Sequence, residues 1–265
     1  MTITWLASYP KSGNTWVRFI LYQCLFGEPK ESMDINRRIP DIHRRLAGDA
    51  LENPGSGEPI FVKTHYELTP KHPELARTAR ALHIIRDPRD VLLSALNYRR
   101  LNGVTEAQLS DRSYAEQFIR VGGDATWRQQ GMGTWASHAD SWSAADFPVL
   151  TIRYEDLKRD ARDVMRGVID FLGLEVADDA LARAVEGSSF ERLRAMEIRE
   201  KADARKKDGL FLGDTRTSRK GVFFMNKGRS GQSLDGAIGP GVDAMFDAAF
   251  GKSLARFGYD RPASR

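Results

Sequence analysis

Short apolar runs alternate with longer amphipathic stretches along the chain. Four runs have the pattern of buried strands: residues 2–8 (TITWLAS), 59–64 (PIFVKT), 81–86 (ALHIIR) and 147–154 (FPVLTIRY). Helical patterns follow three of them, over 14–26, over 88–100 and up to about residue 172. Almost continuously apolar strands separated by helices predict an α/β fold, in which a central parallel sheet is covered by helices on both faces.

The remaining stretches complete one domain, because no repeat or second unit is visible over 1–265. Residues 103–133 are polar and rich in glycine, and residues 197–220 are dense in charge. We expect both to form mobile loops over an acceptor site, although a charge run is also typical of a solvated face. Residues 242–259 predict an amphipathic closing helix, and Trp135 and Trp142, seven residues apart, predict core packing on one helix face.

The connection after the first strand, SYPKSGNTW, has the character of an anion site. Pro10 fixes a turn, and Gly13 permits backbone angles that other residues resist. The helix that starts near Asn14 directs unpaired N–H groups and the positive end of its dipole at the strand end. Lys11 adds a full positive charge. The turn alone is equally compatible with a simple helix start capped by Asn14 or Ser12.

Composition narrows the class of ligand. The 265 residues are 41% hydrophobic and 29% charged, as in a globular protein. The net charge of +4 and the pI of about 9.2 suit a small anionic ligand better than a DNA backbone, so no nucleic-acid partner is expected. No apolar run is long enough to span a bilayer, and no leader is visible before the first strand.

The single cysteine, Cys24, excludes an internal disulfide framework and a thiolate metal cluster. Its apolar neighbours predict a buried thiol. A cytoplasmic location is therefore expected.

The order of residues in the turn differs from the common triphosphate loop GxxxxGK[ST], because Lys11 precedes Gly13. Instead, Y-P-K-S-G-N-T-W resembles the 5′-phosphosulfate loop of the cytosolic-type sulfotransferases. Further matches follow in the family's order: VKTH at 62–65, IIRDPRDVLLS at 84–94, RYEDL at 153–157 and, less closely, FFMNKGRSGQS at 223–233. These matches span most of the chain.

This resemblance implies a P-loop-like fold and transfer of a sulfuryl group from 3′-phosphoadenosine 5′-phosphosulfate (PAPS) to a hydroxyl or amine of a small-molecule acceptor. It implies that the 5′-phosphosulfate is held by Lys11, Ser12, Gly13, Asn14 and Thr15. It further places Trp16 and Tyr154 at the adenine and Arg86 and Ser94 at the 3′-phosphate, with Lys227, Gly228 and Arg229 from the late loop.

Catalytic roles follow from the same resemblance. His65 matches the catalytic base, since a histidine can be neutral near pH 7 and accept a hydroxyl proton. Lys11 would stabilise the charge that grows on the oxygen of the departing nucleotide, with Lys63 as a helper. The other histidines carry no motif; His43, for example, is expected at the surface or in packing. No metal-ligand cluster is evident, so no metal requirement is expected.

Three departures from the family pattern qualify the resemblance. Asp87 stands where the family usually has asparagine, and Asn226 stands where it usually has arginine. Arg229, Arg219 and Lys220 are rival donors for the missing charge. The GRSGQS version of the loop resembles bacterial natural-product members such as the glycopeptide sulfotransferases. The family's C-terminal dimer motif is not found, so an oligomeric state is not carried over.

Two other functions are kept open on the sequence. One is an ATP-dependent small-molecule kinase with a variant phosphate loop, and the other is a non-catalytic nucleotide-binding module. The displaced lysine opposes the first, and the presence of Lys63 and His65 opposes the second. The acceptor is not specified, although basic residues in the variable stretches, among them Arg37, Arg38, Arg44 and Arg45, mildly favour an acidic or polar compound.

Overall fold

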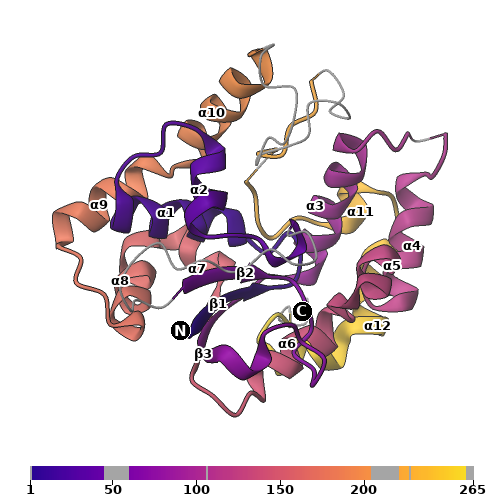
Figure 1. Ribbon diagram of the computed structural model, residues 1–265. Helices are drawn as coiled ribbons and strands as arrows, with labels where there is room; N and C mark the ends of the chain where they lie inside the picture. The colour runs from indigo at the N-terminus through magenta and orange to yellow at the C-terminus, as the bar shows by residue number, and fades with distance from the viewer. Residues whose placement is uncertain (1, 45–59, 106, 204–220, 227, 261–265) are drawn as a thin grey trace.

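The computed structural model describes residues 2–44, 60–105, 107–203, 221–226 and 228–260, and a four-stranded parallel sheet lies at its centre (Figure 1). The strands are β1 (Ile3–Ser8), β2 (Ile60–Thr64), β3 (Thr78–Ile85) and β4 (Val149–Arg153). Their order in the sheet is β2-β1-β3-β4, and all three pairings are parallel. The predicted α/β class and parallel sheet are therefore confirmed, with strand ends within three residues of those expected.

Helices cover both faces of the sheet (Figure 1). One layer packs α1 (Asn14–Phe26), α8 (Ala161–Leu172) and α9 (Asp178–Gly187) on the face that carries Leu6 of β1. The other layer contains α3 (Pro88–Leu101), α4 (Asp111–Val121), α6 (Trp135–Ser143) and α12 (Val242–Arg256). The remaining α-helices are α2 (Ser32–Arg38), α5 (Ala125–Trp127), α7 (Tyr154–Arg159), α10 (Phe190–Ala202) and α11 (Leu234–Ala237). Short 3-10 or π segments are η1 (Ile42–Arg44), η2 (Leu75–Arg77) and η3 (Arg128–Met132).

Alternation along β1 explains the two layers. Ile3, Trp5 and Ala7 belong to the core on the α6 side, whereas Leu6 belongs to the core on the α1 side. All four are fully buried. Trp135 and Trp142 of α6 are also fully buried, to 1% and 0% exposure, so their predicted core role is confirmed.

Several elements differ from the sequence prediction. Residues 103–133 are not a continuous loop, since they contain α4 and α5, and α4 begins with a Ser110 side chain that accepts the N–H of Ser113. The helix expected after β4 is interrupted at Asp160, whose extended backbone ends α7 and whose side chain caps α8. Of the charged stretch 197–220, the first residues continue α10, and 204–220 lie outside the described residues.

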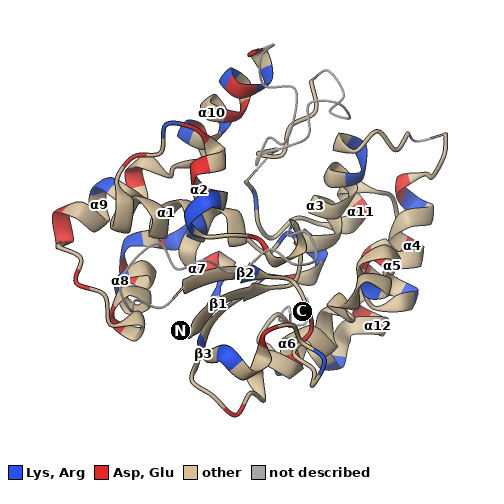
Figure 2. Ribbon diagram, in the orientation of Figure 1, with Lys and Arg blue, Asp and Glu red and all other residues tan. Residues whose placement is uncertain are grey.

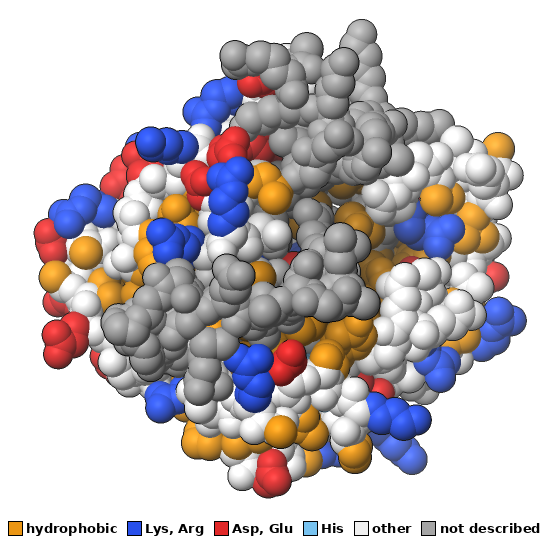
Figure 3. All heavy atoms as spheres, in the orientation of Figure 1, with side chains coloured by type: hydrophobic (Ala, Val, Ile, Leu, Met, Phe, Trp, Pro, Cys, Tyr) orange, Lys and Arg blue, Asp and Glu red, His pale blue; other side chains and the backbone are white. Residues whose placement is uncertain are grey.

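Charged residues are distributed over the outer helices with both signs interspersed (Figure 2). Surface pairs such as Arg112 with Glu116 and Arg183 with Asp179 join residues one helical turn apart. On the face seen in Figure 3, hydrophobic side chains gather near the middle of the molecule, whereas most charges lie toward its edge. Among the described residues, no helix is long and apolar enough to cross a membrane.

Candidate functional site

The site forms where the four parallel strands end. Ser8 ends β1, His65 follows β2, Arg86 follows β3 and Tyr154 follows β4. Because the strands are parallel, all four residues lie at one edge of the sheet. In the order β2-β1-β3-β4, the second strand lies on one side of β1 and the third on the other, and such a switch in strand order is where open α/β sheets bind ligands.

A tight turn joins β1 to α1 at this edge. Lys11 has a φ of 69° and Gly13 a φ of 101°, so two of its residues take left-handed backbone conformations. A side chain at Gly13 would also collide with the Tyr154 ring, because its Cβ would lie 2.5 Å from Cδ2. The Gly13 carbonyl accepts the N–H groups of Trp16 and Val17, and α1 starts at Asn14 as predicted.

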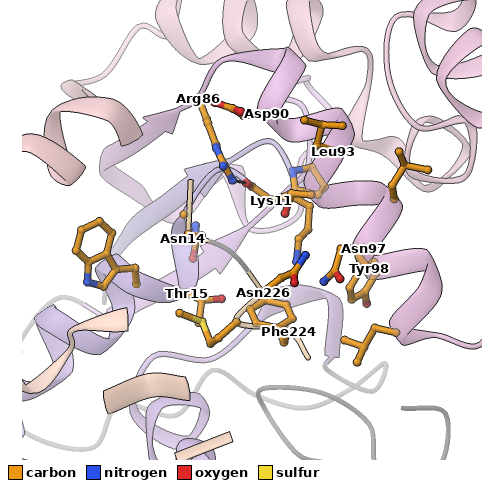
Figure 4. Close-up of a pocket in the computed structure, with 18 of the residues that line it drawn as sticks. Lys11, Asn14, Thr15, Arg86, Asp90, Leu93, Asn97, Tyr98, Phe224 and Asn226 are labelled. Atoms are coloured by element: carbon orange, nitrogen blue, oxygen red, sulfur yellow. Dashed lines mark hydrogen bonds between the residues drawn. The ribbon is translucent and has the colours of Figure 1, made fainter. Parts of the chain in front are cut away.

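A cavity of about 870 Å³ opens beside the turn (Figure 4). Most of the predicted site residues line it together: Lys11, Gly13, Asn14, Thr15, Trp16, Lys63, His65, Arg86, Ser94, Tyr154, Gly228 and Arg229. Ser12 lies in the same turn, buried, but does not line this cavity. Lys227, Arg219 and Lys220 lie outside the described residues.

Several buried polar atoms at the turn have no protein partner among the described residues. They are Ser12 Oγ, Asn14 Oδ1, Trp16 Nε1 and Arg86 Nε. A buried polar group without a partner costs free energy unless a ligand or water completes it. Their concentration around the turn fits a polar ligand that this site is built to hold.

Asn14 is tied to the sheet by its side chain. Its Nδ2 donates to the Leu6 carbonyl at 2.8 Å and to the Ser8 hydroxyl at 3.2 Å. Both hydrogens of this amide group are therefore used, and an anion would meet the backbone N–H of Asn14 rather than its side chain.

Arg86 joins the turn to the late loop. Its guanidinium donates to the carbonyl of Lys11 at 3.0 Å and to the carbonyl of Arg229 at 2.9 Å, and it lies 4.2 Å from the centre of the Tyr154 ring. Asp87 does not pair with Arg86; it caps α3 and binds Arg89, which is buried. The negative charge that Asp87 carries in place of the family's asparagine is thus neutralised by Arg89.

The Lys11 ammonium rests between two aromatic rings (Figure 4). Its Nζ lies 3.8 Å from the centre of the Phe224 ring and 4.7 Å from that of Tyr98. Burial, together with the nearby Arg86 charge, lowers the Lys11 pKa to about 7. Near pH 7 the Lys11 amine is therefore only partly protonated, and an anion bound at the turn would favour its charged ammonium form.

The orientation of His65 is fixed by the strand beside it. Its Nδ1 lies 2.6 Å from the Ser8 carbonyl oxygen, which can only accept, so the proton resides on Nδ1 and Nε2 keeps its lone pair. Burial and the Lys63 charge hold the His65 pKa well below its ordinary value. The imidazole is therefore neutral at pH 7 and able to accept a proton at Nε2.

His43 is a site residue that its sequence context did not reveal. Instead of lying at the surface, it lines the cavity, and its Nε2 accepts the backbone N–H of His65 at 2.9 Å. Its ring packs 4.1 Å from that of Tyr66. Burial lowers the His43 pKa to about 4, which keeps the acceptor nitrogen unprotonated. His43 occupies a short 3-10 turn at Ile42–Arg44 without any motif.

Lys63 forms a buried ion pair with Asp41, whose Oδ2 lies 2.7 Å from Nζ. Although burial favours the neutral acid, the charges of Lys63 and Arg18 hold the Asp41 pKa below its ordinary value. The ammonium of Lys63, which is predicted to help Lys11 stabilise the departing nucleotide, is therefore already paired with a carboxylate.

A second residue missed by sequence reasoning is Phe190, at the start of α10. It lines the same cavity as Trp16 and Tyr154, and the absent side chain of Gly228 makes room for its ring, since a Cβ there would lie 2.8 Å from Cδ2. Trp16 and Tyr154 contact each other edge to face, with ring centres 6.1 Å apart. The cavity thus has an aromatic end next to the turn.

This geometry defines an α/β nucleotide-binding fold with an anion turn, a neutral histidine and an arginine at the sheet edge. A family model described as a sulfotransferase domain matches residues 2–258, and the chain therefore belongs to the sulfotransferase family. The predicted family membership is confirmed.

Individual relatives agree with this membership. Sulfotransferase 2A1 of Rattus norvegicus is 27% identical over 260 residues, covering 95% of this chain and 84% of that protein. The amine sulfotransferase of Oryctolagus cuniculus is 26% identical over 194 residues, covering 71% and 61%. The chain also resembles a retinol dehydratase solved with androsterone and the inactive cofactor PAP, with a TM-score of 0.67, 21% identity and coverage of 98% of this chain and 83% of that one.

A mouse sulfotransferase, SULT7A1 complexed with PAP, has a TM-score of 0.62 at 19% identity, covering 96% of this chain and 84% of that one. At such identities the structural likeness supports the fold alone. Among the described residues, no group of three or more His, Cys, Asp or Glu side chains is arranged to hold a metal ion.

Proposed function

We propose that this protein transfers the sulfuryl group of PAPS to a hydroxyl or amine of a small molecule. The observation that carries the proposal is the convergence of Lys11, His65 and Arg86 on one cavity at the ends of three adjacent strands. A neutral base can accept the acceptor proton, and a cation and a guanidinium can stabilise the anionic groups of the nucleotide. The two similar structures are complexes with PAP, which is 3′-phosphoadenosine 5′-phosphate, the nucleotide that remains after PAPS has lost its sulfuryl group. These complexes support the choice of nucleotide.

The nucleotide is assigned to the turn and the aromatic end of the cavity. The N–H groups at the start of α1 would bind the 5′-phosphate. Ser12, which is buried behind the cavity lining with an unpartnered hydroxyl, stays a predicted ligand. Trp16, Tyr154 and Phe190 supply aromatic surface for the adenine. Thr15, with its hydroxyl on the first turn of α1, stays a predicted phosphate ligand.

The 3′-phosphate is assigned to Arg86 and Ser94. Arg86 retains an unpartnered Nε beside the turn, and Ser94 lines the cavity from α3. Arg229 brings its backbone carbonyl to Arg86 and lines the same cavity. A planar guanidinium next to a hydroxyl is well suited to a phosphate, and this contact would separate PAPS from ATP.

PAPS supplies a sulfuryl group already activated by its phosphate anhydride bond. His65 accepts the proton of the acceptor hydroxyl at Nε2 as the hydroxyl oxygen approaches sulfur. Lys11 stabilises the negative charge that develops on the departing phosphate oxygen, where an ammonium acts more strongly on the transition state than on the bound substrate. Lys63 supports this charge from β2, and Asp41 holds Lys63 in place.

The acceptor is assigned to the part of the cavity bordered by α3, α5 and the segment Arg128–Met132 that follows α5. Leu93, Leu96, Trp127 and Met132 give this part an apolar lining, and Asn97 and Gln130 give it amide groups. A small molecule with an apolar body fits such a lining. The cytoplasmic location, the absence of a metal requirement and a bacterial natural-product acceptor stay predictions; the relatives from Rattus norvegicus and Oryctolagus cuniculus described above are animal proteins.

Binding and transfer experiments test the proposal together. We expect PAP to raise the melting temperature, whereas ATP with Mg²⁺ gives a much smaller shift. Labelled PAPS should transfer sulfate to an acceptor in a panel of phenols, alcohols and amines, with or without EDTA. Preference for ATP and loss of transfer in EDTA would indicate a kinase instead. PAP binding without turnover on any acceptor would indicate a binding module.

A further inference from the structure

A buried carboxylate on α10 holds the cavity wall opposite the turn. Glu197 is 1% exposed. Its Oε1 accepts the backbone N–H of Phe224 at 2.6 Å, and its Oε2 accepts that of Met225 at 2.9 Å. Lys201, one turn later on the helix, donates to Oε1 at 2.7 Å. Glu197 thus binds two successive N–H groups with its two oxygens, a geometry that fixes a backbone closely.

Contacts from both sides restrain the same segment. Arg194 of α10 donates to the Met225 carbonyl and lies 3.4 Å above the Phe223 ring. From α3, the amide of Asn97 donates to the Phe223 carbonyl at 2.9 Å. Residues 223–225 are therefore held between α10 and α3, and Glu197 supplies the only carboxylate among these contacts.

This segment meets the catalytic lysine through one ring. Phe224 lies 3.8 Å from Lys11 Nζ and contacts Tyr98 edge to face, with ring centres 6.4 Å apart at 86°. Figure 4 shows Lys11 extending toward Phe224 and Tyr98 from the turn. A cation over an aromatic face is favourable, so the position of Phe224 affects both the place and the charge of the ammonium.

The charged groups around Lys11 come from three elements. Arg86 at the end of β3 and Lys63 of β2 both lower the Lys11 pKa, as burial does. Glu197 of α10 opposes them and raises it. Glu197 is itself faced by Lys201 and Arg194 of its own helix.

We propose that Glu197 is a positioning residue for the cofactor site, because its carboxylate fixes the backbone of Phe224 and Met225 and so the aromatic wall against which Lys11 rests. The proposal builds on the sulfotransferase function above and adds a residue outside the motifs of the turn. Through this wall, α10 controls where Lys11 stands when the nucleotide binds.

A matched pair of variants on one helix tests this role. Glu200, three residues after Glu197, is 3% exposed and accepts the N–H and the hydroxyl of Ser32, each at 2.6 Å. It holds the start of α2 and not the segment 223–225. Glu197→Gln and Glu200→Gln therefore each remove one buried charge and leave one acceptor oxygen of the two, but only the first touches the wall over Lys11.

PAP affinity measured by calorimetry from pH 6 to pH 9 distinguishes the two variants. Glu197→Gln should weaken PAP binding about 10-fold or more, because a charged hydrogen bond to residues 223–225 is lost. PAP affinity should fall at alkaline pH as Lys11 loses its proton, and the midpoint of this fall should move to lower pH in Glu197→Gln, since one negative charge near Lys11 is gone. Glu200→Gln should leave this midpoint unchanged, and Glu197→Asp should restore part of the affinity.

An unchanged midpoint in Glu197→Gln, or the same shift in Glu200→Gln, would overturn the proposal. If Glu197→Gln does not fold, Phe224→Leu tests the wall directly, because it keeps the carboxylate and removes the ring. Its midpoint should also move to lower pH, and an unchanged profile would overturn the role of the wall. Failure of the unmodified protein to bind PAP would instead contradict the sulfotransferase function itself.

Discussion

The Nδ1 atom of His65 lies 2.6 Å from the carbonyl oxygen of Ser8, and this contact joins the ends of two neighbouring strands. A carbonyl cannot donate, so the contact assigns the proton to Nδ1 and leaves Nε2 as the basic atom. The sheet therefore sets the tautomer of the base as well as its position.

Removal of this base should affect chemistry and spare binding. For His65→Ala we expect the turnover number to fall by about 10²- to 10⁴-fold, the usual contribution of general base catalysis. The dissociation constant of PAP should change little, because the assigned nucleotide contacts come from the turn and Arg86. Single-turnover transfer from labelled PAPS and calorimetry with PAP measure the two quantities, and full activity of the variant would show that another group accepts the proton.

Nucleotide binding should depend on pH through Lys11. In the free protein the Lys11 pKa is lowered to about 7, and an anion at the turn should raise it again. Binding at pH 8 therefore takes up a proton, and PAP affinity should decline by up to about tenfold per pH unit above pH 7. Calorimetry in two buffers of different ionisation enthalpy measures this uptake.

Two substitutions at Lys11 serve as controls. Lys11→Met has no titrating group there, and Lys11→Arg stays charged throughout, so both should remove the alkaline decline. Persistence of the decline in either variant would assign it to another group.

Two glycines with a positive φ allow the effect of backbone strain to be separated from the effect of a collision with Tyr154. Gly13→Ala adds a Cβ 2.5 Å from the Tyr154 ring, whereas Gly27→Ala, at a φ of 80°, meets nothing within 4 Å. Both should lose about 1–2 kcal/mol of stability from the backbone conformation. Only Gly13→Ala should also weaken PAP binding, since it displaces Tyr154. Chemical denaturation with PAP titration compares the two, and equal PAP affinity would remove Tyr154 from the assigned nucleotide site.

Discrimination of the 3′-phosphate should depend on Arg86. Arg86→Lys loses the planar guanidinium that bridges the turn and the late loop. We expect the ratio of PAP affinity to adenosine 5′-phosphate affinity to fall about 10- to 100-fold, as for loss of a charged hydrogen bond. Ser94→Ala should lower the same ratio less. A ratio unchanged in Arg86→Lys would move the 3′-phosphate elsewhere.

The sheet and the first helix could be predicted because they are built from continuous apolar runs. The strand over 3–8 and the helix over 14–26 follow directly from such runs and from the glycine at each end of the helix. The helix α10 was missed because two of its three buried residues are glutamates. The buried residues of α4 have helical spacing, at Tyr114, Ala115, Phe118 and Ile119, but the glycines of the surrounding stretch favoured a loop. The break at Asp160 was missed because a capping aspartate inside a continuous helical pattern gives little signal.

The sequence predicted those site residues that belong to recognisable motifs. The turn, His65 and Arg86 each end a buried strand and carry a recognisable pattern. His43, Asp41 and Glu197 lie in polar stretches, and their partners are 22 to 28 residues away in the chain. Contacts of this kind depend on the fold, so neither spacing nor composition indicates them.

The pairing of β1 with both β2 and β3 makes the end of the sheet next to the site resistant to local unfolding. Ala7 pairs with Thr64, and Ser8 pairs with Ile84, in the last rungs before the site. Central strands exchange their amide protons only on global unfolding, whereas peripheral helices open more readily. Under mild denaturant, the acceptor contacts of α5 should therefore be lost before the nucleotide contacts of the turn after β1.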